Sequence, residues 1–296
     1  MSMTNDTRAP DGRSGVLAVG ARRLAWTIEG EGPPILVPGS ALYYPRVLSP
    51  ALRRRHRLVF LDHRGFAPLS EGAAEEPVDL DRIVADIEAM RAEIGVERAM
   101  ILGHSGHAYM ALAYAARHPE RISGVVLVAA GPSHAPAHMA MAERRWAELV
   151  APARKARFEA DMAGLADAIA RDPDRRFVAL CLALRARMWA DPGFDAAPLW
   201  EGVRTDMRVV DALWGEAFAA IDTAAHLRAI PAPILLVLGA HDYAVAPPET
   251  WEPYRGHARD LEVRVLEGSG HTPMLEEPEA FDAVLQAWAR RVGTAR

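Results

Sequence analysis

Residues 101–131 read ILGHSGHAYMALAYAARHPERISGVVLVAAG, a pattern that predicts a strand, a sharp turn, a helix and a second strand. Ser105 stands at the turn, within the sequence Gly-His-Ser-Gly-His. This nearly matches the Gly-x-Ser-x-Gly turn on which enzymes mount a nucleophilic serine, and such a match has meaning only between a strand and a helix. His107 replaces the last glycine, while Gly106 supplies a small residue one position earlier. The stretch therefore predicts a serine held in a strained turn above a sheet.

Short apolar runs alternate with helical periodicity along most of the chain. Residues 80–94 place apolar side chains on one helical face, with Asp79 as the N-cap and Gly95 as the C-terminal stop. A hairpin that turns near Gly20 precedes these units. Such alternation is typical of an α/β protein with a mostly parallel sheet and helices on both faces, in which ligands bind beyond the carboxyl ends of the strands. The expected strands cover residues 33–39, 56–65, 99–103, 122–132, 233–239 and 261–268.

The character of the sequence changes in the middle of the chain. Between residues 134 and 225 the strand-like runs disappear, and Ala, Arg, Met and Trp dominate. We therefore expect three parts: a disordered N-terminus at residues 1–15, an α/β core formed by residues 16–133 and 226–296, and a helical cap inserted into that core.

The bulk properties are those of an ordinary globular protein. The 296 residues are 50% hydrophobic and 25% charged, with a formal net charge of −5. This balance gives no reason to expect nucleic acid or an anionic membrane as a partner. The polar N-terminus lacks the apolar core of a signal peptide, and no apolar run reaches the roughly 20 residues of a membrane span. We expect a soluble, cytoplasmic protein that acts on a small molecule. The sequence does not indicate its oligomeric state.

Three features have a structural interpretation. Cys181 is the only cysteine, so an intrachain disulfide is excluded, and its apolar neighbours predict a buried, inert thiol. His134 and His138 have the spacing of helical metal ligands, but no third ligand accompanies them. We expect no metal and no cofactor. Asp62 and Arg64, in the sequence LDHRG, are expected to hold a turn through a local charge pair.

A nucleophilic serine needs a base, and the base needs an acid that orients it. His271 follows the last predicted strand in a glycine-rich loop, whereas His56 and His118 flank elements at the other end of the sheet and are expected at the surface. Asp242 follows the strand at 233–239, at the same edge as the serine. The order serine, aspartate, histidine along the chain is that of an α/β-hydrolase triad.

With these residues identified, the chain resembles the α/β-hydrolase fold proteins, within the broad group of small esterases, lactonases and proline iminopeptidase-like enzymes. The resemblance rests on GHSG, LGAHD, GSGH and LDHRG and extends from about Val16 to Val292. It implies a catalytic triad of Ser105, Asp242 and His271 on a mostly parallel α/β-hydrolase sheet with a helical cap.

An oxyanion hole belongs to the same resemblance. The backbone N–H of Gly106, directly after the serine, is one expected donor. The second donor comes from the loop after an early strand, which reads PGSA at residues 38–41. Either Ser40 or Ala41 fits, and the sequence does not distinguish them. Pro38 departs from the His-Gly that the family usually carries there.

The pocket is less well defined by the sequence. Tyr43 and Tyr44 follow the oxyanion loop and are expected to line the pocket, with Trp146 as one candidate from the cap. His107 has two interpretations. Its imidazole contacts the substrate or the loop that carries Asp242, or it packs inside the turn while Gly106 relieves the crowding. We favour packing, because substitutions at packed sites are often compensated locally.

The site predicts a serine hydrolase that cleaves a small to medium, mainly apolar ester, lactone or amide through an acyl-enzyme. One alternative is a proline iminopeptidase-like aminopeptidase, with cap acids such as Glu143, Glu148 and Asp161 as candidates to bind a free amine. Gly106 stands where that subgroup usually carries Trp, which weighs against it. Another alternative is a receptor or sensor that keeps the triad but only binds, since fold alone does not fix function.

Overall fold

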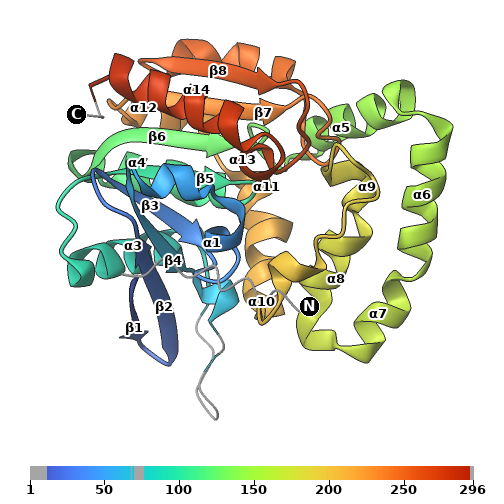
Figure 1. Ribbon diagram of the computed structural model, residues 1–296, viewed down its shortest axis with the longest axis horizontal. Helices are drawn as coiled ribbons and strands as arrows, with labels where there is room; N and C mark the ends of the chain where they lie inside the picture. Colours follow the sequence, from blue (N-terminus) through green and yellow to red (C-terminus); the bar gives the residue numbers. More distant parts are fainter. Residues whose placement is uncertain (1–11, 68, 70–76, 294–296) are drawn as a thin grey trace, which may run out of the picture.

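The computed structural model describes residues 12–67, 69 and 77–293, and its centre is one sheet of eight strands in the order β1-β2-β4-β3-β5-β6-β7-β8 (Figure 1). The pairs β1·β2 and β2·β4 are antiparallel, and every later pair is parallel. The strands are β1 (Arg13–Val19), β2 (Arg22–Glu29), β3 (Pro34–Gly39), β4 (Arg57–Asp62), β5 (Ala99–His104), β6 (Ile122–Val128), β7 (Ile234–Gly239) and β8 (Leu261–Leu266).

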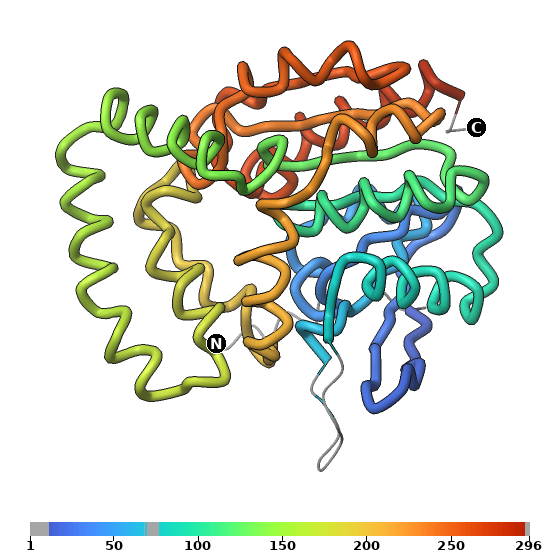
Figure 2. The backbone as a smooth tube through the Cα atoms, turned by 180° about the vertical axis from the view of Figure 1, so that it is seen from behind, coloured from blue at the N-terminus to red at the C-terminus, as the bar shows by residue number. Residues whose placement is uncertain are grey.

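The central strands are covered on both faces. Every residue of β5 and β7 is buried, which explains why both read as continuous apolar runs rather than as alternating patterns. Helices α3 (Leu80–Ile94), α4 (His107–Arg117) and α12 (Thr223–Ala229) pack on one face, while α13 (Pro273–Glu276) and α14 (Pro278–Arg291) lie on the other (Figures 1 and 2). The short elements of the core are α1 (Tyr44–Val47), α2 (Pro50–Arg53), η1 (Arg64–Phe66), η2 (Pro119–Arg121) and η6 (Pro248–His257).

A helical segment, residues 134–225, lies between β6 and β7 and arches beside the sheet (Figure 1); it is called the cap segment, or cap, below. Of residues 134–225, all of which the structure describes, none lies in a strand, although the predicted boundary at 225 falls inside α12. The cap elements are α5 (Pro136–Leu149), α6 (Pro152–Ala163), α7 (Leu165–Arg171), η3 (Pro173–Arg175), α8 (Arg176–Ala183), α9 (Arg185–Met188), η4 (Ala197–Trp200), α10 (Met207–Val210), the π-helix η5 (Asp211–Ala217) and α11 (Phe218–Ala220).

Most predicted elements are present, with local corrections. Asp79 caps α3 by accepting from Arg82 N, and Gly95 ends that helix with a φ of 76°. Residues 1–11 of the expected disordered N-terminus lie outside the described residues, whereas residues 13–15 already belong to β1. His56 was expected at the surface but is only 2% exposed.

Candidate active site

Ser105 occupies a strained turn between β5 and α4. Its φ is 56°, and within the described part of the chain only Ala129 is another non-glycine residue with positive φ. Such a conformation costs about 1–3 kcal/mol and persists where the surrounding structure enforces it. Here the crowding is explicit, because a Cβ at Gly103 would lie 2.4 Å from the carbonyl oxygen of His107 on α4. Strand and helix therefore meet so closely that the serine is pushed out at the strand's carboxyl end.

Asp242 and His271 form a buried pair at the same edge of the sheet. Nδ1 of His271 lies 2.8 Å from Oδ2 of Asp242, and the side chains are each 3% exposed. Since a carboxylate accepts, His271 Nδ1 carries the proton and Nε2 keeps a lone pair that can act as a base. Ala244 N donates to Asp242 Oδ1 at 2.9 Å and fixes the carboxylate. The His271 ring lies 5.0 Å from the ring of His104, which directly precedes Ser105.

The loop that carries His271 is held by Glu276, a residue that the sequence analysis did not single out. Its Oε2 accepts from Gly270 N at 3.1 Å and from Ala190 N of the cap at 2.7 Å, while its Oε1 accepts from Thr272 N at 2.9 Å. Burial raises the pKa of this carboxyl, and the three backbone donors oppose that rise. Glu276 therefore fixes the backbone on both sides of His271. No pattern in the sequence HTPMLE, residues 271–276, indicates this role.

The loop after β3 offers one of its two expected oxyanion donors. The N–H of Ala41 donates to Asp62 Oδ1 at 2.6 Å and is therefore engaged. This leaves the N–H of Ser40 as the candidate from this loop, in addition to that of Gly106. The Ser40 hydroxyl accepts from Leu42 N at 3.2 Å, so the loop is also braced from within.

The turn after β4 is held differently from the expectation of a local charge pair. Arg64 pairs with Asp86 on α3, at 2.5 and 3.0 Å, and not with Asp62. Asp62 instead serves the oxyanion loop, and burial raises its pKa to about 7. The expectation was wrong because the partner of Arg64 lies 22 residues away and is brought close only by the packing of α3.

His107 belongs to a hydrogen-bond network behind the nucleophile. His104 Nε2 donates to His271 O at 2.7 Å, because a carbonyl can only accept. The Tyr44 hydroxyl lies 3.3 Å from His104 Nδ1 and 2.7 Å from His107 Nδ1, and the latter atom also lies 3.2 Å from His104 O. All these groups are satisfied when His107 Nδ1 donates and Tyr44 donates onward to His104. The hydrogen bond of His107 thus goes to Tyr44, at the start of α1, rather than to the Asp242 loop.

The shifted glycine has a direct explanation in the cap. A Cβ at Gly106 would lie 2.6 Å from the indole of Trp214 on η5 and 2.8 Å from the ring of Phe218 on α11. Gly106 is therefore required by the close approach of the cap, whereas position 107 has room for an imidazole whose ring lies 5.5 Å from that of Trp214.

The other predicted pocket residues, Tyr43 and Trp146, lie in two separate parts of the structure. Tyr43 is buried with its ring 4.3 Å from that of Trp200 in the cap, and burial raises its pKa. Trp146 packs in a small cluster with Tyr243, at 5.8 Å between ring centroids, and so lies on the acid side of the site. The structure thus brings Tyr43, Tyr44 and the oxyanion loop together but places Trp146 apart from them.

A cap arginine holds the loop that carries Asp242. Arg145 on α5 donates to the carbonyl oxygen of Asp242 at 2.8 Å and to that of Ala240. Its guanidinium also lies 5.1 Å from the Tyr243 ring, and Arg154 lies 5.2 Å from the same ring. The position of the acid therefore depends on the cap.

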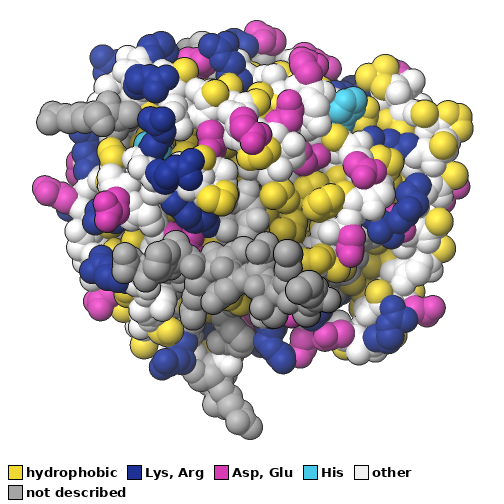
Figure 3. All heavy atoms as spheres, viewed as in Figure 1, with side chains coloured by type: hydrophobic (Ala, Val, Ile, Leu, Met, Phe, Trp, Pro, Cys, Tyr) yellow, Lys and Arg dark blue, Asp and Glu magenta, His cyan; other side chains and the backbone are white. Residues whose placement is uncertain are grey.

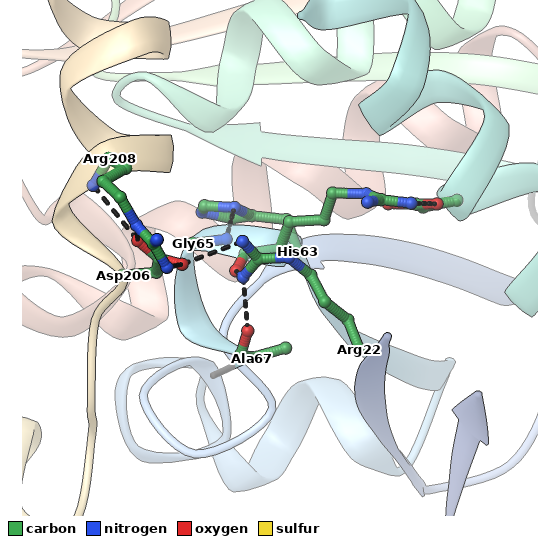
Figure 4. A network of polar contacts seen from close by, with 8 residues as sticks. Arg22, His63, Gly65, Ala67, Asp206 and Arg208 are labelled. Atoms are coloured by element: carbon green, nitrogen blue, oxygen red, sulfur yellow. Dashed lines mark hydrogen bonds and ion pairs between the residues drawn. The ribbon is translucent and has the colours of Figure 1, made fainter. Parts of the chain in front are cut away.

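A buried ion pair fastens the far end of the cap to the core (Figure 4). Arg22 on β2 donates to Asp206 Oδ2 at 2.8 Å and to the carbonyl oxygens of Arg64 and Ala67 at 2.9 and 2.7 Å. Asp206 N donates in turn to Gly65 O at 2.7 Å. The Asp206 carboxylate also accepts from Arg208, so Asp206 joins β2 and α10 through its side chain and the β4 turn through its backbone N–H.

Metal and membrane features were searched over the same described residues. No group of three His, Cys, Asp or Glu side chains is placed to hold a metal ion there, and no described helix is long and apolar enough to cross a bilayer. His138 instead bonds the Ser133 hydroxyl at 2.8 Å. Cys181 is buried, as predicted, and burial raises the pKa of its thiol to about 12.

Comparison with known proteins identifies the family of the chain. Residues 36–278 match the family model of the alpha/beta hydrolase fold. The chain belongs to the α/β-hydrolase fold family. It is 42% identical over 276 residues to the AB hydrolase superfamily protein YclE of Bacillus subtilis, which covers 93% of this chain and 98% of the relative.

Solved structures of this fold include enzymes of several activities. Proline iminopeptidase of Mycobacterium smegmatis matches with a TM-score of 0.71 at 20% identity, over 95% of this chain and 98% of that one. The enol-lactonase of Burkholderia xenovorans matches with a TM-score of 0.63 at 21% identity, over 93% and 100% of the two chains. These likenesses support an α/β hydrolase and leave the substrate open.

Proposed function

We propose that the protein is a serine hydrolase that cleaves an ester, lactone or amide through an acyl-enzyme. The observation that carries the proposal is the buried Asp242–His271 hydrogen bond of 2.8 Å at the sheet edge where Ser105 stands in its strained turn. A histidine whose Nδ1 donates to a carboxylate presents a basic Nε2, which is the group that activates a serine hydroxyl.

The mechanism follows from these groups. His271 Nε2 takes the proton of the Ser105 hydroxyl as its oxygen attacks the substrate carbonyl. Asp242 stabilises the imidazolium, and the N–H groups of Gly106 and Ser40 bind the oxyanion. His271 then gives the proton to the leaving group, which leaves Ser105 acylated. In the second half His271 takes a proton from water, the water oxygen attacks the acyl carbonyl, and His271 returns the proton to Ser105 as the acid is released. Apart from the water consumed in hydrolysis, every catalytic role in this scheme falls to a side chain or backbone group of this chain.

The surroundings of the site suit a small to medium, mainly apolar substrate. Hydrophobic side chains gather on the face where the cap meets the core (Figure 3). Leu42, next to the oxyanion loop, is 49% exposed, and Leu180 on α8 is 37% exposed. Apolar linings with a few polar groups are typical of small-molecule sites. Action in the cytoplasm remains a prediction from the sequence.

The aminopeptidase alternative is less well supported. A relative at 25% identity, over 86% of this chain, is the proline iminopeptidase of Heyndrickxia coagulans. The cap carboxylates considered for a free amine are, however, poorly suited to bind one. Asp161 already pairs with Arg157 and Arg185, Glu143 pairs with Arg187, and Glu148 is exposed to solvent.

Hydrolysis of a p-nitrophenyl ester series beside proline p-nitroanilide tests the proposal. We expect the esters to be cleaved, and Ser105→Ala to lower kcat by roughly 10⁴-fold or more. Cleavage of the anilide alone would favour the aminopeptidase. Ligand binding without any turnover would favour the receptor, and unchanged turnover in Ser105→Ala would contradict the assignment of the nucleophile.

A further inference from the structure

Two buried imidazoles beside the nucleophile each present a nitrogen without a hydrogen-bond partner. His63, on the turn after β4, is 1% exposed, and His107 is 6% exposed. Within the described residues, Nε2 of each ring is buried and bonds to nothing. Buried polar atoms in folded proteins are nearly always paired, so two orphans in one place call for an explanation.

The hydrogen bond at Nδ1 of each ring decides whether its unpartnered Nε2 is a donor or an acceptor. His63 Nδ1 accepts from Gly65 N at 2.9 Å, so its Nε2 carries the proton and is a donor. His107 Nδ1 donates within the Tyr44 network, at 2.7 Å from the hydroxyl oxygen, so its Nε2 is an acceptor. Burial lowers the pKa of both rings, which keeps them neutral and preserves this donor and acceptor pattern.

The two rings are also placed to act on one group. Their centroids lie 5.1 Å apart, a separation compatible with two hydrogen bonds of about 2.9 Å to a single oxygen between them. Both rings contact Phe66, at 4.6 and 5.8 Å, and both contact Trp214, at 6.1 and 5.5 Å. His63 and His107 therefore place two polar nitrogens next to the aromatic rings of Phe66 and Trp214.

Trp214 is the residue of that surrounding that also approaches Gly106. It stands on the π-helix η5 and is only partly buried, and its indole approaches Gly106, the expected oxyanion donor. Single-turn π-helical segments occur frequently at functional sites. Because its ring contacts both imidazoles and approaches Gly106, we expect Trp214 to shift when a substrate group enters between them.

We propose that His63 and His107 form a specificity subsite for a hydroxyl group on the substrate, which Trp214 covers until the substrate is bound. A hydroxyl accepts from His63 Nε2 and donates to His107 Nε2 through its one proton. A plain acyl chain leaves both nitrogens unpaired and is therefore bound less well. The inference rests on the proposed function, because the subsite selects among esters presented to Ser105.

Binding to the Ser105→Ala protein tests the subsite without requiring turnover. The probes are methyl 3-hydroxybutanoate and methyl butanoate, which differ by one hydroxyl, titrated by calorimetry. We expect the hydroxy ester to bind about tenfold more tightly, as two net hydrogen bonds imply. Adding His63→Phe or His107→Phe should reduce the preference to less than about twofold. Equal affinity for the two esters in the parent, including no measurable affinity for either, overturns the proposal.

His56→Phe is the matched control, because this histidine is equally buried, also has an unpartnered ring nitrogen and precedes β4 at the opposite end of the sheet. It should keep the preference. Nitrogen NMR of the histidine rings in Ser105→Ala gives a second readout that does not depend on folding of the variants. The Nε2 resonances of His63 and His107 should shift with the hydroxy ester and not with the plain ester, and no shift would contradict the subsite. Ester hydrolysis by the wild type, measured separately, reports on the proposed function alone.

Discussion

The Gly106→Ala substitution would bring a methyl group into contact with the cap, because Trp214 and Phe218 are the side chains nearest to this position. The Cβ of Gly106→Ala would lie 2.6 Å from Trp214 and 2.8 Å from Phe218, although the φ of −56° suits alanine well. We expect this change to lower the free energy of unfolding by about 1–3 kcal/mol, measured by urea denaturation. Trp214→Ala in the same chain should restore part of that loss. An unchanged free energy of unfolding in Gly106→Ala would contradict this, because it would show that η5 moves away from position 106 at no cost.

His104 predicts a specific loss of stability in acid. Burial, with His271 nearby, lowers the pKa of His104 from 6.5 to about 3. The unfolded chain therefore takes up a proton near pH 6.5 that the folded chain refuses, so stability falls as the pH drops through this window. Between about pH 8 and about pH 5 one such group contributes a loss of about 2 kcal/mol.

The corresponding measurement compares unfolding free energies of the wild type and His104→Gln at these two pH values. The variant should lose about 2 kcal/mol less than the wild type on acidification. The same pH dependence in both proteins would mean that His104 is protonated in the folded state.

At the scale of single elements, α5 contacts the loop of Asp242, the proposed catalytic acid. Arg145 reaches two carbonyl groups of the Asp242 loop with two nitrogens of one guanidinium, which a lysine cannot reproduce. We expect Arg145→Lys to lower kcat about tenfold, since the orientation of His271 depends on Asp242. Arg144→Lys is the matched control, because Arg144 is exposed on the same helix. Equal kcat values in both variants would show that the acid keeps its place without α5.

Elements that follow local rules were predictable, whereas contacts between elements were not. The N-cap Asp79 and the stop at Gly95 act within a few residues, and both are found where the sequence places them. The engagement of Ala41 by Asp62 and the pairing of Arg64 with Asp86 depend on how distant segments pack. The periodicity of apolar residues in a sequence indicates a helix or a strand, but it does not indicate which other element packs against it.

For the whole molecule, Arg22 is expected to keep the cap seated. Its side chain is 2% exposed and joins the core to Asp206, which is 7% exposed. Arg22→Met leaves a buried carboxylate with one fewer partner and should lower the free energy of unfolding by about 3 kcal/mol. Hydrogen exchange should show faster exchange in α10 and η5. The exposed neighbour provides the control, since Arg23→Met should change neither quantity.

The order of the fold and the position of the site could be inferred from sequence because strand ends in a parallel sheet share one edge. The rule predicts that Ser105, Asp242 and His271 share this edge, and the structure pairs His271 with Asp242 at 2.8 Å. Their catalytic roles stay a prediction. Residues that act through the backbone, such as Glu276, carried no recognisable signal. The role of Gly106 against Trp214 also required the structure, because it joins positions 108 residues apart through the seating of the cap.

Covalent labelling with a fluorophosphonate, read by intact mass and peptide mapping, tests the central claim most directly. A serine activated by His271 attacks phosphorus and keeps the adduct. The account predicts one adduct, located on Ser105, absent in Ser105→Ala and greatly slowed in His271→Ala. An adduct on another residue, or undiminished labelling of Ser105→Ala, would contradict it.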